Sequence, residues 1–176
     1  LEEEEIYMAS IEDLFSEDSS DSLNTLMDAY WTAWEDLSNN PSGETEQDAV
    51  YAAGLALTDR INAIEESLSD LTADLNTEIA SAVTEINSLA EQIAGLNLSI
   101  ITAEGAGGNA NDLTDERNAL VDDLGELIDI DIVVKEDGSY LITTNGLPLV
   151  EDGISYNLSL EQGSIFWNGQ SSNTYD

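Results

Sequence analysis

The sequence predicts an α-rich α+β fold, in which an elongated antiparallel helical bundle with one very long helix precedes a small antiparallel β region. Three observations lead to this prediction. An apolar stripe with helical spacing runs from Ile61 to Ile100 without a proline. The spacing of apolar residues then changes from helical to alternating after Asp129. Turn dipeptides of the Asn-Gly and Asp-Gly kind recur beyond that point.

Two shorter helices are expected before the long one. Residues 1–15 form a short and weakly amphipathic helix, and residues 23–37 form a clearer one with apolar side chains at steps of three and four. The second helix carries Tyr30, Trp31 and Trp34 on its apolar stripe. Aromatic residues at helical spacing are more often core anchors than a ligand cage, so these three are predicted to anchor a core. The Asn-Asn-Pro sequence that follows ends the helix.

The long helix is expected from Thr45 to Glu104, a length of about 90 Å at 1.5 Å per residue. Its apolar residues follow a heptad pattern with one four-residue stutter near Leu75. A glycine-rich loop ends it, and a fourth helix continues the same spacing, so the two helices are expected to pair antiparallel. The predicted helix-packing stripe consists of Ile61, Ile64, Leu68, Leu71, Leu75, Ile79, Ile86, Leu89, Ile93, Leu96, Ile100, Leu113, Leu120, Leu124 and Leu127.

The β region begins after Asp129. Alternating apolar residues, an Asp137-Gly138 hairpin turn and further turn dipeptides predict short antiparallel strands, one of them from Ile154 to Leu160. The chain is therefore expected to divide into a helical rod domain, residues 1–129, and a β-hairpin-rich region, residues 130–176, that begins a further domain. Because the chain starts without Met inside a predicted helix, we expect an internal fragment of a longer protein.

The charge balance excludes several partners. The 176 residues include 38 Asp plus Glu against 3 Lys plus Arg, for a formal net charge of −35. This field repels phosphate backbones and anionic lipid head groups, so neither nucleic acid nor a membrane surface is an expected partner. No apolar run is long enough to cross a bilayer. The acidity fits either a saline habitat or an ordinary acidic surface, and the sequence does not choose between them.

The residues needed for common catalytic and metal sites are missing or badly placed. The chain has no His and no Cys, which excludes Ser-His-Asp and Cys-His relays, imidazole ligands and thiolate ligands. Calcium-loop spacing fails at Lys135, and the glycine-rich loop at residues 105–110 follows a helix and lacks the strand that a dinucleotide site needs. We therefore expect no enzyme activity, no cofactor, and no catalytic or metal-binding residue. A carboxylate pair that binds or hydrolyses glycans stays open as the less favoured alternative.

The apolar stripe is the remaining candidate for function. It either closes an internal core or meets neighbouring subunits, and it outruns what two short helices can cover. A free-standing acidic coiled-coil interaction protein is one alternative that this pattern allows. The chain by itself is expected to be a monomer of elongated hydrodynamic shape.

Three stretches in order resemble one family. Residues 28–41, with an aromatic pair followed by Leu and Asn-Asn-Pro, residues 74–97 of the long helix, and residues 111–121, Asn-Asp-Leu-Thr-Asp-Glu-Arg-Asn-Ala-Leu-Val, are similar to flagellar hook-associated proteins of the hook–filament junction. In register, the resemblance covers about residues 20–150. Heptads alone recur in unrelated coiled coils, so the order of the three matches carries the weight.

The resemblance implies a secreted, non-catalytic structural component of the extracellular bacterial flagellum that joins hook to filament. It implies neighbouring copies of the chain, the hook protein and a second junction protein as partners, and a role in flagellum assembly and cell motility. The terminal helices of the family are absent here, so the fragment is not expected to polymerise by itself. The Lys and Arg residues scattered through the family are depleted, and no interface residue is carried over.

Overall fold

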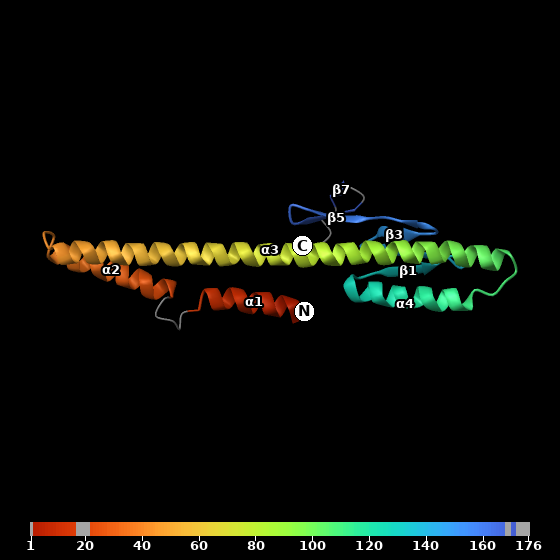
Figure 1. Cartoon of the computed structure of the whole chain (residues 1–176), viewed down its shortest axis with the longest axis horizontal. Coiled ribbons are helices and arrows are strands. Elements are labelled where there is room, and N and C mark those ends of the chain that lie inside the picture. Colours follow the sequence, from red (N-terminus) through yellow and green to blue (C-terminus); the bar gives the residue numbers. More distant parts are fainter. Residues whose placement is uncertain (1, 17–21, 168–169, 172–176) are drawn as a thin grey trace. The chain divides into compact units, whose positions relative to one another are not determined.

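The computed structural model describes residues 2–16, 22–167 and 170–171. Within them, four helices precede seven strands (Figure 1). The helices are α1 (Glu2–Leu14), α2 (Leu23–Asn39), α3 (Glu44–Gly105) and α4 (Asn111–Leu127). The 62-residue α3 and the antiparallel strands that follow α4 confirm the predicted fold class.

The chain packs as two compact units that divide within α3. The N-terminal unit is Leu1–Leu75 and the C-terminal unit is Asn76–Asp176. Helix does give way to strand near Asp129, since α4 ends at Leu127 and the first strand begins at Asp131. The C-terminal part of α3 and all of α4, however, pack with the strands. The division expected at residue 129 therefore follows secondary structure, whereas packing places the boundary at Leu75.

The N-terminal unit has a thin core. Ser22 caps α2, where its hydroxyl oxygen accepts a hydrogen bond of 3.2 Å from the backbone N–H of Thr25. Among the described residues of this unit, the buried apolar side chains are Ala33 and Ile64. So small a buried apolar area gives this unit less hydrophobic stabilisation than its length suggests.

The C-terminal unit contains two antiparallel sheets. The first is a four-stranded meander of β1 (Asp131–Val134), β2 (Tyr140–Thr144), β3 (Leu147–Glu151) and β4 (Ile154–Ser155). The second contains β5 (Leu158–Glu161), β6 (Ser164–Trp167) and β7 (Gln170–Ser171). The turn residues Asn145 and Gln162, each followed by a glycine, have positive φ angles, as two-residue hairpins require.

One predicted strand is wrong. The stretch from Ile154 to Leu160 contains two strands of different sheets, because β4 pairs with β3 whereas β5 pairs with β6. The change of sheet is fixed by the side chain of Asn87 on α3, which bonds both the backbone N–H and the carbonyl of Leu158. Asn168-Gly169, one of the further turn dipeptides of the sequence, lies outside the described residues.

The core of the C-terminal unit lies between α3, α4 and the strands. α4 runs beside the C-terminal part of α3 (Figure 1), and the apolar side chains between them close against the first sheet. The second sheet joins through the indole N–H of Trp167, which donates to the carbonyl of Pro148 at 2.6 Å. The buried core consists of Val83, Ile86, Leu89, Ala90, Ile93, Ala94, Val121, Leu124, Ile142, Leu149, Val150 and Leu158.

Candidate functional site

The helix-packing stripe is covered unevenly along α3 and α4. In the C-terminal unit, the buried members are Ile86, Leu89, Ile93, Ile100 and Leu124, the half-buried ones are Ile79, Leu96, Leu113 and Leu120, and Leu127 is exposed. In the N-terminal unit, Ile64 is buried, Leu68, Leu71 and Leu75 are half-buried, and Ile61 is exposed. The stripe thus closes a core in one unit and stays partly open in the other. Its role in contacts between subunits stays a prediction.

The predicted aromatic anchors do not share a core. Tyr30 is half-buried and packs against α3 at Gly54, where an added Cβ would lie 3.4 Å from the tyrosine ring. Trp31 and Trp34, by contrast, are 63% and 45% exposed. The expectation that both tryptophans anchor a core is not met in the described chain, because α2 meets α3 through Tyr30 and the buried Ala33.

A groove lies beside this aromatic cluster. It has a volume of about 530 Å³ and is lined by Tyr30, Val50, Tyr51, Gly54, Leu55, Leu57 and Thr58. The ring of Tyr30 stands 5.8 Å from that of Trp31 and 6.2 Å from that of Trp34, measured between centroids. The groove and the exposed rings together form a largely apolar surface on α2 and α3.

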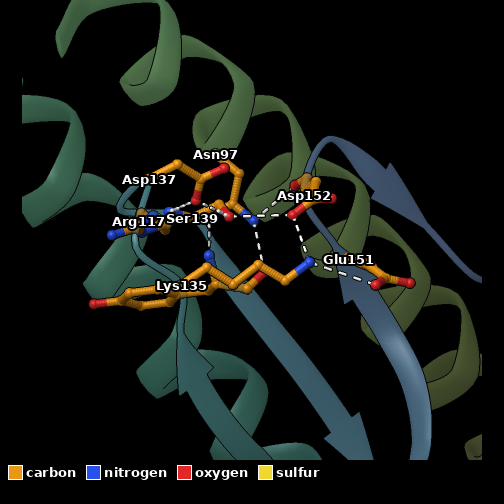
Figure 2. A network of polar contacts seen from close by, with 8 residues as sticks. Asn97, Arg117, Lys135, Asp137, Ser139, Glu151 and Asp152 are labelled. Atoms are coloured by element: carbon orange, nitrogen blue, oxygen red, sulfur yellow. Dashed lines mark hydrogen bonds and ion pairs between the residues drawn. The ribbon is translucent and has the colours of Figure 1, made fainter. Parts of the chain in front are cut away.

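A buried polar junction joins α3, α4 and the first sheet in the C-terminal unit (Figure 2). Its centre is Asn97 of α3, whose side chain is fully buried. The amide nitrogen of Asn97 donates to the carbonyls of Tyr140 and Asp152 at 2.9 and 2.8 Å. The amide oxygen accepts from the backbone N–H of Tyr140 at 3.1 Å and from Arg117 at 2.8 Å. Every hydrogen-bonding position of this amide is therefore used.

Arg117 of α4 is the second component of the junction. It is 2% exposed, and its Nη1 donates to the Asn97 oxygen and to the carbonyl of Gly138, both at 2.8 Å. Its guanidinium carbon lies 3.5 Å from the centre of the Tyr140 ring, which is a cation–π contact. No carboxylate of the described chain forms an ion pair with it. The buried charge is thus held by neutral oxygens and one aromatic face, which makes it sensitive to any loss among them.

The outer edge of the junction is ionic. Lys135 Nζ contacts Asp152 at 2.7 Å and Glu151 at 3.4 Å, and chiefly the bond with Asp152 raises the pKa of Lys135 above 10.5. The hydroxyl and then the backbone N–H of Ser139 donate to Asp137, which lowers the pKa of that carboxyl below 3.8. These contacts order the turn that follows β1 and tie it to the end of β3.

Sequence reasoning found only part of this junction. Arg117 lies within the resembling stretch, residues 111–121, but no role was predicted for its side chain. Asn97 was missed, although a signal existed: it follows Leu96 of the stripe and lies four residues after Ile93 and three before Ile100, so a polar side chain lies at the edge of the stripe on the same helix face.

The site offers no arrangement for carboxylate catalysis. Among the described residues, no Asp or Glu is buried, and no three acidic side chains are grouped to hold a metal ion. The paired acids in an aromatic pocket that a glycan hydrolase needs are therefore not found in this part of the chain. What the geometry provides is a rigid junction in one unit and an exposed apolar surface in the other.

Comparison with known families decides the relationship. A model of the flagellar hook-associated protein FlgK helical domain matches residues 8–174. The chain belongs to this family. The matched range includes α2, α3, α4 and both sheets, so the family relationship covers both compact units.

Relatives from distant bacteria support the assignment. Flagellar hook-associated protein 1 of Bacillus subtilis is 30% identical over 145 residues, which cover 82% of this chain and 29% of the relative. That of Salmonella typhimurium is 31% identical over 155 residues, covering 86% of this chain and 28% of the relative. The chain therefore spans less than a third of the length of these relatives.

A solved structure shows the same fold. The flagellar hook junction protein FlgK from Burkholderia pseudomallei matches 92% of this chain and 30% of its own length, with a TM-score of 0.77 and 25% identity. No helix in the described part of this FlgK-family chain combines the length and the apolar character that crossing a membrane requires.

Proposed function

We propose that this chain is a non-catalytic segment of a protein that joins the flagellar hook to the filament. The observation that supports the proposal most strongly is the family match across residues 8–174, which includes both compact units. The relatives are named as hook-associated proteins, and the solved relative as a hook junction protein. The protein would act outside the cell, after export, as part of the flagellum.

The proposed mechanism is geometric. The Asn97–Arg117 junction holds α3, α4 and the first sheet in one arrangement, so the C-terminal unit resists deformation. The C-terminal unit thereby offers neighbouring subunits a fixed surface. The partners are neighbouring copies of the protein, hook protein and the second junction protein. Contacts of this kind transmit force without any chemical step.

A chimaera tests the proposal. In Bacillus subtilis, the stretch of hook-associated protein 1 that aligns with this chain is replaced by this chain, and swimming and the position of the chimaera on isolated flagella are measured. We expect filaments attached to hooks, with the chimaera at the boundary. A matched chimaera with Asn97→Leu, which disrupts the junction, should show fewer attached filaments. An exported chimaera that is absent from the boundary would contradict the proposal.

Neither alternative from the sequence gains support from a particular observation. An acidic coiled-coil protein unrelated to flagella would not match a hook-associated family through its strands as well as its helices. A glycan-binding or hydrolysing domain requires paired acids that the described residues do not provide.

A further inference from the structure

The exposed apolar surface of the N-terminal unit is built from two helices. α2 contributes Trp31, 63% exposed, and α3 contributes Tyr51 and Leu55, 74% and 50% exposed. The groove of about 530 Å³ is lined by Tyr30, Tyr51 and Leu55 among others, and the ring of Trp31 stands 5.8 Å from that of Tyr30. Tryptophan and tyrosine beside a groove are the residues that most often dominate the energy of a protein interface.

Acidic residues flank these apolar side chains on the same helix faces. On α3, Asp48 precedes Tyr51 by three residues and Asp59 follows Leu55 by four. On α2, residues 28 and 35 are Asp and Glu, three before and four after Trp31. Residues at these spacings share one face of a helix. All four carboxylates are exposed, and within the described chain none has a cation within ion-pair distance.

The cations of this chain are already engaged. Arg60 Nη2 donates to the carbonyl of Leu14 at 2.8 Å, at the C-terminal end of α1. Arg117 is buried in the junction, and Lys135 is paired with Glu151 and Asp152. These three are all the Lys and Arg of the sequence. A second copy of this chain therefore brings carboxylates and no available cation to the acidic rim.

We infer that the α2–α3 groove is a docking site for an amphipathic helix of a different polypeptide, one whose apolar stripe is flanked by Lys or Arg. The apolar stripe would lie in the groove against Tyr51 and Leu55 and extend over the neighbouring ring of Trp31, and the cations would pair with the rim carboxylates. Like charge disfavours a second copy, nucleic acid and an anionic membrane alike. The inference goes beyond the proposed function, since it depends on this surface alone.

The probe is a synthetic amphipathic peptide of leucine and lysine, about 18 residues or five turns long. Its binding to the whole chain is measured by fluorescence anisotropy at about 0.15 M salt, where distant charges are screened. A peptide with glutamate in place of lysine is the charge control. We expect the lysine peptide to bind and the glutamate peptide not to bind.

Matched variants separate docking from general attraction to an acidic protein. The double variant Trp31→Ser and Leu55→Ser should bind the lysine peptide at least about tenfold more weakly, as expected for central interface residues. The control variant is Val134→Ser and Ile154→Ser, whose side chains are 64% and 59% exposed on the sheet. It should bind within about twofold of the unaltered chain, since these residues lie outside the groove.

Charge variants provide a second, independent readout. Asp48→Asn with Asp59→Asn should weaken binding and reduce its dependence on salt, whereas Asp122→Asn with Asp123→Asn, exposed on α4, should leave both unchanged. Equal losses in the groove and control variants, binding of the glutamate peptide, or no binding of either peptide would overturn the inference. So would sedimentation showing that the chain dimerises through Trp31 and Leu55.

Discussion

Replacing Asn97 with Ala should destabilise the C-terminal unit more than most single substitutions do. The change removes four hydrogen bonds from a fully buried position, two of them to the backbone of Tyr140, one to Asp152 and one to Arg117. Alanine offers no replacement donor or acceptor, and Arg117 is buried with Asn97. The loss is therefore one of satisfied polar groups as well as of packing.

The magnitude follows from the kinds of bond. Each of the three neutral bonds contributes about 1 kcal/mol net, and the bond from the guanidinium of Arg117 contributes about 1.5–3 kcal/mol. We expect Asn97→Ala to lower the free energy of unfolding by about 4.5–6 kcal/mol, above the range of most single substitutions. This is a large part of the stability of an ordinary domain.

Asn87 provides a matched control on the same helix. Its amide makes the same two-point contact with a strand, donating to the carbonyl of Leu158 at 2.8 Å and accepting from its N–H at 2.7 Å. It is half-buried and has no cation beside it. Asn87→Ala should cost about 1–2 kcal/mol. The difference between the two variants reports the bond from Arg117 together with one further neutral bond and deeper burial.

The assay uses a single fluorophore in the C-terminal unit. The sequence has three tryptophans, and the variant Trp31→Phe with Trp34→Phe leaves only Trp167. The Trp167 ring stacks on Tyr156 with centroids 5.4 Å apart, so its emission reports unfolding of this unit. Urea titration followed by the emission of Trp167 then gives the free energy of unfolding of each variant.

Two results would refute the reasoning. Equal losses of unfolding free energy for Asn97→Ala and Asn87→Ala would mean that the bond from Arg117 to Asn97 adds no stability. A double-mutant cycle with Arg117→Met that shows no coupling between Asn97 and Arg117 would lead to the same conclusion.

Three further predictions concern charge, helix propensity and the first helix. Because the pKa of Asp137 is lowered in the folded chain, this group contributes stability above about pH 3.8, and that stability is lost as the pH falls through the lowered pKa. Because the pKa of Lys135 is raised, this group contributes stability below about pH 10.5, and that stability is lost as the pH rises through the raised pKa. Asp137→Asn should flatten the acid limb of the stability profile and Lys135→Met the alkaline limb, as measured by urea titration across pH. Gly54→Ala should stabilise the N-terminal unit by about 0.5–1 kcal/mol, because helix propensity rises and the new Cβ makes an ordinary contact with the tyrosine ring; tryptophan fluorescence in a Trp167→Phe background measures this. Arg60→Gln removes the cation at Leu14, so the amide protons of α1 should exchange faster by mass spectrometry while those of α4 do not change.

Periodicity made most of the fold predictable. The long helix was expected from Thr45 to Glu104 and runs from Glu44 to Gly105. It was predictable because only an α-helix places apolar residues at steps of three and four on one face. The hairpins were equally local, since each turn dipeptide needs positive φ. The break between β4 and β5 depends on Asn87, about seventy residues away in sequence, and no local pattern contains that information.

The candidate sites were less predictable for a related reason. Spacing shows that Trp31 lies on an apolar stripe, but it does not show whether another element covers that stripe. The junction needs Asn97, Arg117 and Tyr140 to meet, and their separation along the chain hides this arrangement. Only the polar residue at the edge of the stripe points to it from sequence. The family resemblance identified the chain by the order of its motifs without indicating any of these contacts.

The positions of the three Lys and Arg residues also determine how readily trypsin-like proteases can cleave this chain. Trypsin-like proteases cut only after Lys and Arg, and this sequence gives them three places to do so. Arg60 lies in the N-terminal third of α3 with its side chain bonded to α1. Arg117 is buried in α4, and Lys135 is held at the end of β1 by two carboxylates. Cleavage at any of them first requires local unfolding, because a protease must draw an extended segment into its cleft. The folded chain should therefore survive such enzymes for far longer than its unfolded form.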